Sequence, residues 1–153
     1  FYNKVMKKFF LIVLILLASC GYQPIYLNKN FKNLEFNKIT SEGEENINMQ
    51  IINSLSFKES QYDLSLNSLK LNSSFKISET SKNSKGQVES YRSKIIVNLI
   101  IKNKEDIITD KVFEEQFDYN NKENKFELVR YQNEVKNNLI NKIVEDIFLH
   151  INL

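Results

Sequence analysis

The sequence contains few of the residue types on which many kinds of protein function depend. Among 153 residues there are one cysteine, one histidine, one proline, three glycines and no tryptophan. A single cysteine excludes a disulfide framework within the chain, and one cysteine with one histidine argues against a zinc site. Because glycine and proline are scarce and 42% of the residues are hydrophobic, the composition is that of a globular chain and not of a disordered one.

The chain also lacks a strong net charge. It has 21 Lys and Arg residues against 19 Asp and Glu residues, a formal net charge of +2. Lys4, Lys7 and Lys8 lie in a segment that we expect to be removed, which leaves 18 basic against 19 acidic side chains. This balance excludes a generally basic nucleic-acid binder as the default interpretation. The length suits one domain, and no internal repeat is present.

The longest apolar run lies near the amino terminus. A pair of lysines precedes the apolar residues 9–17, and two small residues then lead to Cys20. This order is typical of a secretory signal peptide. As a helix, the apolar run spans only about 14 Å. The hydrocarbon core of a bilayer is about 30 Å thick, so the run is too short for a permanent span. We expect residues 1–19 to form a signal peptide, with translation beginning at Met6.

Residues 17–20, Leu-Ala-Ser-Cys, resemble the lipobox of bacterial lipoproteins. In that class the cysteine sulfur receives a diacylglycerol, the signal is cut before it, and the new amino terminus is acylated. The alternative is that Cys20 is a buried small hydrophobe. The basic pair, apolar run and small residues in register favour lipidation, and no other cofactor is expected. By the enterobacterial sorting rule, Gly21 after the cysteine implies export to the outer membrane.

The rest of the chain predicts a tether at 20–33 and one α+β domain at 34–153. The expected elements are a strand at 34–40, a helix at 44–55, an interrupted strand at 62–77, strands at 91–102 and 107–119, and a helix after 124 that runs almost to the end of the chain. Apolar stripes on both helices predict a two-layer sandwich, with two helices packed on a roughly four-stranded, mostly antiparallel sheet. The first strand is joined through a helix and can therefore pair in parallel.

Two short sequence patterns mark the expected helix starts. Ser41 with Glu44, and Asn124 with Glu127, have the spacing of a capping box. In the strand at 91–102, alternation assigns Ile95, Val97 and Leu99 to one face and Arg92 and Lys94 to the other. In the return strand, Phe113, Phe117 and Tyr119 are expected to share one side.

The sequence offers no set of catalytic residues. His150 is the only histidine, and we expect it to cap a helix end or meet solvent. A Ser-His-Asp or Cys-His arrangement would need further partners. The acidic pairs at 44–45 and 114–115 cannot act on one substrate, because neighbours along a strand point to opposite faces. There is no glycine-rich phosphate loop and no metal-spaced ligand group. We therefore expect the protein not to be an enzyme.

Charge is unevenly distributed along the predicted strands. Residues 70–104 carry a local charge of +6, and residues 105–127 carry −5. One interpretation is cross-strand pairing on a solvated face, which contributes little to stability. The other is a surface for an anionic ligand, in which Arg92, Lys94 and Lys85 contact phosphate or carboxylate groups.

Residues 20–26, Cys-Gly-Tyr-Gln-Pro-Ile-Tyr, resemble the start of the lipopolysaccharide-assembly lipoprotein family (LptE). The order of elements that follows is similar as well. The resemblance implies a lipoprotein at the periplasmic face of the outer membrane that plugs a large β-barrel partner, LptD. Together such proteins place lipopolysaccharide in the outer leaflet, and the lipoprotein also assists barrel assembly. It implies lipidation of Cys20, with Arg92, Lys94 and Lys85 as candidate lipopolysaccharide contacts.

Two other functions remain open. The protein could be a structural lipoprotein of another envelope machine, such as the complex that inserts barrels into the outer membrane. It could also be a periplasmic solute-binding or enzymatic lipoprotein, which the missing catalytic set disfavours.

Overall fold

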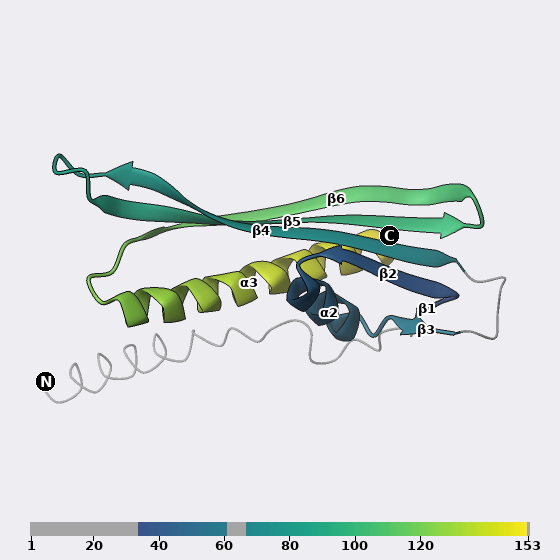
Figure 1. The fold of residues 1–153 in the computed structure, drawn as a ribbon. Helices are drawn as coiled ribbons and strands as arrows, with labels where there is room; N and C mark the ends of the chain where they lie inside the picture. The colour runs from purple at the N-terminus through teal and green to yellow at the C-terminus, as the bar shows by residue number, and fades with distance from the viewer. Residues whose placement is uncertain (1–33, 61–66, 153) are drawn as a thin grey trace, which may run out of the picture. The chain divides into compact units, whose positions relative to one another are not determined.

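The computed structural model describes residues 34–60 and 67–152, all within one compact unit (Figure 1). The elements in chain order are β1 (Glu35–Phe36), β2 (Lys38–Gly43), α2 (Glu45–Ser54), β3 (Lys58–Glu59), β4 (Ser68–Lys82), β5 (Val88–Asn103), β6 (Asp106–Asn120) and α3 (Lys125–Asn152). The expected signal peptide, the tether with Cys20, and residues 62–66 of the second expected strand lie outside the described residues.

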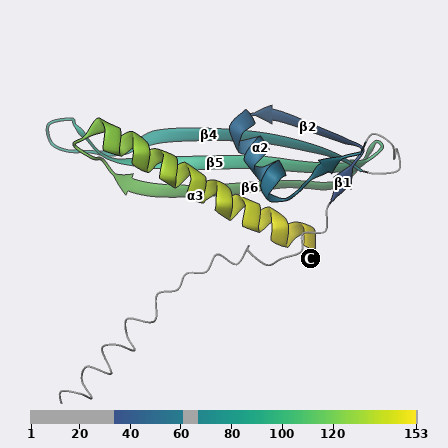
Figure 2. The same ribbon diagram turned by 90° about the horizontal axis from the view of Figure 1, so that it is seen from below.

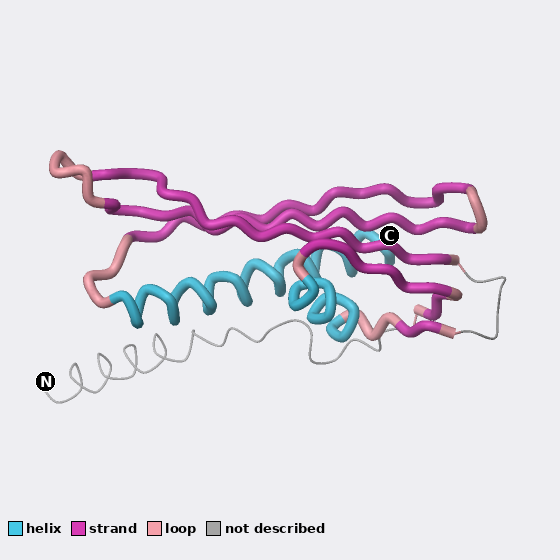
Figure 3. Tube along the Cα trace, in the orientation of Figure 1, coloured by secondary structure: helices cyan, strands magenta, loops and turns pink. Residues whose placement is uncertain are grey.

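The main sheet has four strands in the order β2-β4-β5-β6. The β4–β5 and β5–β6 pairs are antiparallel, whereas β2 pairs with β4 in parallel, with Thr40 opposite Lys70. Both described helices lie on one side of this sheet (Figure 3). The α+β two-layer prediction is therefore confirmed, including the parallel pairing of the first strand.

Alternating side chains explain which face of β5, one of the two inner strands, is buried. Ile95, Val97 and Leu99 are fully buried on the side of the helices, as their spacing predicted. In α3, the buried residues recur at helical spacing: Val135, Leu139, Ile140, Ile143, Val144 and Ile147. The helix runs obliquely along the sheet, beside the shorter α2 (Figure 2). Although α3 has 28 residues, no described helix has an apolar stretch long enough to cross a bilayer.

The first expected strand is divided in two, which the sequence analysis missed. Residues 35–36 form β1, which pairs in parallel with β3 in a separate two-stranded sheet. The rings of Phe36 and Phe57 meet edge to face there, with centroids 5.3 Å apart. Strands of two residues are too short to show a period, so their pairing was invisible in the sequence.

The capping box expected at Ser41 is wrong. Ser41 lies inside β2, and α2 begins at Glu45 after Glu44, whose side chain makes no capping bond. Pairing with β4 extends β2 to Gly43 and moves the start of the helix. The junction is held instead by Asn48, whose side-chain amide donates to the Glu42 carbonyl at 2.8 Å, and by Ser73, whose hydroxyl donates to the Glu44 carbonyl at 3.1 Å.

The second cap and most of the return strand follow the prediction. The backbone amides of Phe126 and Glu127 donate to the Asn124 side-chain oxygen, at 2.9 and 3.4 Å. Phe113 and Tyr119 of β6 are buried beneath α3, whereas Phe117, opposite Ser93, is 46% exposed. Phe117 still shares one side with Phe113 and Tyr119, as predicted, because all three lie opposite residues on the helix-facing side of β5. It is more exposed because β6 is an edge strand, which a neighbouring strand covers on one side only.

Candidate functional site

Two of the predicted anion contacts, Arg92 and Lys94, lie on the face of β5 that neither described helix covers. Arg92 and Lys94 alternate with the buried Ser93 and Ile95, so their side chains point away from the core. The β4–β5 register places Lys76 directly opposite Lys94. Like charges opposite one another repel, so this pair raises the local positive potential of the face.

Arg92 forms a two-pronged ion pair with Asp118 on β6. Its Nε donates to Asp118 Oδ1 at 2.6 Å, and its second terminal nitrogen donates to Oδ2 at 2.7 Å. The hydrogen bonds from Arg92 are the main cause of a lowered pKa of the Asp118 carboxyl; burial opposes them, and the opposite charge adds to them. The same pairing raises the pKa of Arg92. The two bonds hold the guanidinium against Asp118, its cross-strand neighbour on β6.

Lys94 is also paired across the same strands. Its Nζ lies 2.6 Å from a carboxylate oxygen of Glu114, and both side chains remain partly exposed. The neighbouring Glu115 reaches toward Lys142 of α3, with an N–O distance of 3.6 Å. Glu114 and Glu115 thus lie on opposite faces, as predicted, and cannot act on one substrate. The cross-strand pairing interpretation is confirmed, while the anionic-ligand interpretation stays a prediction.

The structure does not bring Lys85 next to Arg92. Lys85 lies in the β4–β5 turn, where its backbone amide donates to the Asn83 side chain at 3.0 Å. Gly86 follows with a φ of 79°, a conformation that favours glycine. The Lys85 side chain is exposed and forms no ion pair with the described residues. Lys85 thus lies beyond the last β4–β5 residue pair, Lys82 with Val88, whereas Arg92 lies inside the sheet opposite Ser78.

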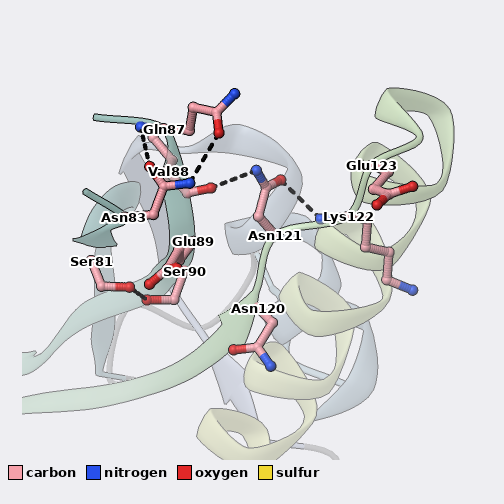
Figure 4. Close-up of a pocket in the computed structure, with 10 residues that line it drawn as sticks. All are labelled: Ser81, Asn83, Gln87, Val88, Glu89, Ser90, Asn120, Asn121, Lys122 and Glu123. Carbon is pink, nitrogen blue, oxygen red and sulfur yellow. Dashed lines mark hydrogen bonds between the residues drawn. The ribbon is translucent and has the colours of Figure 1, made fainter. Parts of the chain in front are cut away.

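An open polar cavity of about 680 Å³ lies where this turn meets the β6–α3 loop (Figure 4). It is lined by Ser81, Asn83, Gln87, Val88, Glu89, Ser90, Asn120, Asn121, Lys122 and Glu123. The Asn121 side chain donates to the Val88 carbonyl at 2.8 Å and joins the two loops, and Asn83 donates to Gln87 at 2.9 Å. The β4–β5 turn and the β6–α3 loop both fall between elements that were predicted from the sequence. The contact between the two loops was not predicted.

His150, the other residue considered from the sequence, lies away from Arg92 and Lys94. His150 is exposed near the end of α3, as expected, and its ring meets Phe113 edge to face at 5.8 Å. Residues 34–60 and 67–152 contain no group of three His, Cys, Asp or Glu side chains placed to hold a metal. Lys76 was not singled out from the sequence, although its alternation along β4 could have placed it beside Lys94.

No protein-family model and no functionally curated protein matches the chain. Three solved bacterial structures share its fold. The crystal structure of rare lipoprotein B from Shewanella oneidensis has a TM-score of 0.58 and 14% identity, covering 76% of this chain and 94% of that chain. The minor lipoprotein from Acinetobacter baumannii has a TM-score of 0.53 and 12% identity, covering 73% and 87%.

The solution structure of an uncharacterized lipoprotein B from Nitrosomonas europaea has a TM-score of 0.55 and 9% identity, covering 79% of this chain and 86% of that chain. At these identities the similarity establishes the fold: two helices over one face of a mostly antiparallel sheet.

Proposed function

We propose that this protein is a lipid-anchored, non-enzymatic component of lipopolysaccharide assembly that occupies the LptD barrel at the outer membrane. The proposal rests on two independent observations, the fold and the sequence that precedes it. The fold is shared with bacterial proteins named as lipoproteins, over 94% of the chain of one of them. The sequence before that fold resembles a lipobox at residues 17–20 and an LptE opening run at residues 20–26.

The anchor is the first step to test. Cys20 would carry a diacylglycerol on its sulfur and an acyl group on its nitrogen, and several chains would hold the protein stably at the membrane. Cys20→Ser should leave the precursor uncut and keep the mature form out of the lipid-labelled fraction. Ser19→Ala, which keeps a small residue before the cut, is the matched control and should be processed normally. A cut and acylated product from Cys20→Ser would contradict the proposal.

The partner is the second step. The face of the sheet that no described helix covers is polar and charged around Arg92 and Lys94, which suits a wet interface with a barrel interior. A tag after Leu153 should recover LptD from gently solubilised outer membrane. Recovery of the barrel-insertion machinery without LptD would favour the alternative, a structural accessory of that machinery.

The lipopolysaccharide contact is the third step. Arg92 and Lys94 are held by their acidic partners, so a phosphate group would compete with Asp118 and Glu114 for the same cations. Lys85 has no such competitor among the described residues. Changing all three to Glu should weaken binding of purified lipopolysaccharide by about tenfold or more. Charge reversal at Lys58, Lys111 and Lys125, which form no ion pair in the described part, is the control.

A second variant separates ligand binding from fold damage. Asp118→Asn removes the competitor of Arg92 while keeping its shape, so lipopolysaccharide should bind more tightly to this variant if Arg92 contacts phosphate. Unchanged binding in both the triple reversal and Asp118→Asn, with an intact circular dichroism spectrum, would exclude these residues as the contact.

A further inference from the structure

Lys76 and Lys94 form a pair of like charges on the open face, by which we mean the face of the main sheet that neither described helix covers (Figure 3). They are directly opposite one another on β4 and β5. Residues directly opposite on antiparallel strands point to the same face, with Cβ atoms about 4.5–5.5 Å apart, and like charges there repel. The pair is therefore unfavourable in the protein alone, and an anion bound between the two ammonium groups would remove the repulsion.

Lys76 forms no ion pair with any described residue. Its neighbours on the same face of β4 are Ser74 and Ser78, which carry no charge. Glu79, the nearest acid on β4, pairs with Lys82 at 2.9 Å. The exposed ammonium group of Lys76 is therefore available to a ligand.

The two basic residues of β5 differ in how firmly their acidic partners hold them. Arg92, which is opposite Ser78, makes two hydrogen bonds to Asp118, at 2.6 and 2.7 Å. Lys94 makes one contact with Glu114, with an N–O distance of 2.6 Å. An exposed lysine–carboxylate pair contributes at most about 1 kcal/mol, whereas the two-bond pair is stronger and more specific in its geometry. Lys94 can therefore exchange its carboxylate for a ligand more readily than Arg92 can.

The main sheet also leaves Lys76 accessible from the side of β2. β2 pairs with β4 only from Ser68 to Ser73, so it does not extend to Lys76. Neither described helix lies over the open face. An anion can therefore approach Lys76 from the face and from the strand edge.

We propose that Lys76 and Lys94 together bind one phosphate group, with the hydroxyl of Ser78 as a further donor. A phosphate monoester carries up to two negative charges and three acceptor oxygens, which suits two ammonium groups and a hydroxyl. Lys94 turns from Glu114 to the phosphate, and Lys76 gains the partner that it lacks in the protein alone. The ligand is a phosphate group, either on a lipid head group or free in solution. Only its assignment to lipopolysaccharide rests on the proposed function.

The test measures binding to the full chain in detergent by isothermal titration calorimetry. Its probes are lipopolysaccharide, lipopolysaccharide from which the phosphate groups have been removed, and inorganic phosphate. Lys76→Gln should weaken binding of intact lipopolysaccharide by about tenfold and leave binding of the dephosphorylated probe unchanged. Lys70→Gln is the matched control, because Lys70 lies on the same face of β4 but pairs with Glu42 at 2.8 Å, and it should change neither. Glu114→Gln, which frees Lys94, should tighten binding of the intact probe.

Inorganic phosphate separates the two sources of the ligand. If Lys76→Gln weakens binding of both probes and intact lipopolysaccharide binds more tightly than inorganic phosphate, the site is supported and belongs to a lipid phosphate. If the two probes bind equally well and Lys76→Gln weakens both, the site is supported and belongs to free phosphate.

A loss of binding in Lys76→Gln is separable from fold damage. The variant removes a repulsion, so its stability in urea unfolding should equal or exceed that of the original chain. The inference is overturned if Lys76→Gln binds intact lipopolysaccharide as the original chain does, or if the dephosphorylated probe binds as tightly as the intact one.

Failure of this site and failure of the proposed function give different results. If Lys76→Gln has no effect while the triple reversal of Arg92, Lys94 and Lys85 weakens lipopolysaccharide binding, this inference falls and the proposed function stands. If LptD is not recovered with the tagged chain, the proposed function falls. The calorimetry uses the chain without LptD, so its result for Lys76 is unaffected.

Discussion

The hydroxyls of Ser93 and Tyr119 lie 3.0 Å apart in the core, between β5 and β6. Ser93 is fully buried and Tyr119 is 5% exposed. The Tyr119 ring also contacts Tyr91 and Tyr131, at centroid distances of 6.0 and 5.6 Å. Tyr119 thus joins the central strand, the edge strand and α3 through one polar bond and two ring contacts.

Tyr119→Phe should destabilise the domain by about 1–2 kcal/mol, because it keeps both ring contacts but leaves the Ser93 hydroxyl buried without this partner. Urea unfolding measures the change. In the double variant with Ser93→Ala no hydroxyl remains unpaired, so part of the loss should be recovered. A Tyr119→Phe variant as stable as the original would show that the bond contributes nothing.

Gly43→Ala should be among the most damaging single substitutions at the β2–α2 junction. Gly43 has a φ of 83°, and an added Cβ would lie 1.9 Å from the backbone oxygen of Ser73. We expect a loss above about 2 kcal/mol, because the clash adds to the cost of a left-handed alanine. Gly86→Ala is the control: its φ is 79°, but nothing lies within 4 Å, so only the conformational cost of about 1–2 kcal/mol applies. Equal losses in thermal unfolding would refute the steric argument.

Asn124→Ala should cost about 1 kcal/mol, because two backbone amides at the start of α3 lose their acceptor. Ser41→Ala should change the free energy of unfolding by less than about 0.5 kcal/mol, because Ser41 lies in an exposed strand position and caps no helix. Chemical denaturation of the two variants decides the point, and the reverse order of losses would restore the sequence-based assignment of the first cap.

The Arg92–Asp118 pair should make stability depend on pH at the acidic end. A lowered carboxyl pKa in the folded state contributes stability above the unfolded aspartate pKa of about 3.9. That contribution is lost as the pH falls through the folded pKa. Asp118→Asn should therefore be less stable than the original chain at about pH 7, and the difference in stability should shrink as the pH falls below about 3.9.

The effect should be small, because both side chains are exposed to solvent. Asp110→Asn, on the same strand but without an ion pair, is the control and should show no such pH-dependent difference. If the difference in stability between Asp118→Asn and the original chain stays the same in acid, the loss of stability does not come from the charge of Asp118.

Much of the fold could be predicted because the spacing of apolar residues repeats without a break along β5 and α3. The alternation through Ile95, Val97 and Leu99 identified the central strand and its buried face, and the stripe ending at Ile147 identified α3. The divided first strand and the false cap at Ser41 could not be predicted in this way. A two-residue strand has no period, and the ladder with β4 overrides a local capping preference.

The sequence predicted which basic residues belong to the candidate site, but not which acidic residues pair with them. The sequence indicated which residues of β5 point outward, but not that Asp118 and Glu114 would neutralise Arg92 and Lys94. Strand register decides that pairing, and register depends on both strands at once.

The sequence by itself determined which faces of β5 and α3 are buried, since periodicity and apolar content settle which face of an element avoids water. It also determined the lipobox resemblance at Cys20, which depends only on local order. The tertiary structure alone decided which charges meet and how the loops at Asn83 and Asn121 line an open cavity. Those features depend on contacts between residues far apart in the chain, which no local pattern encodes.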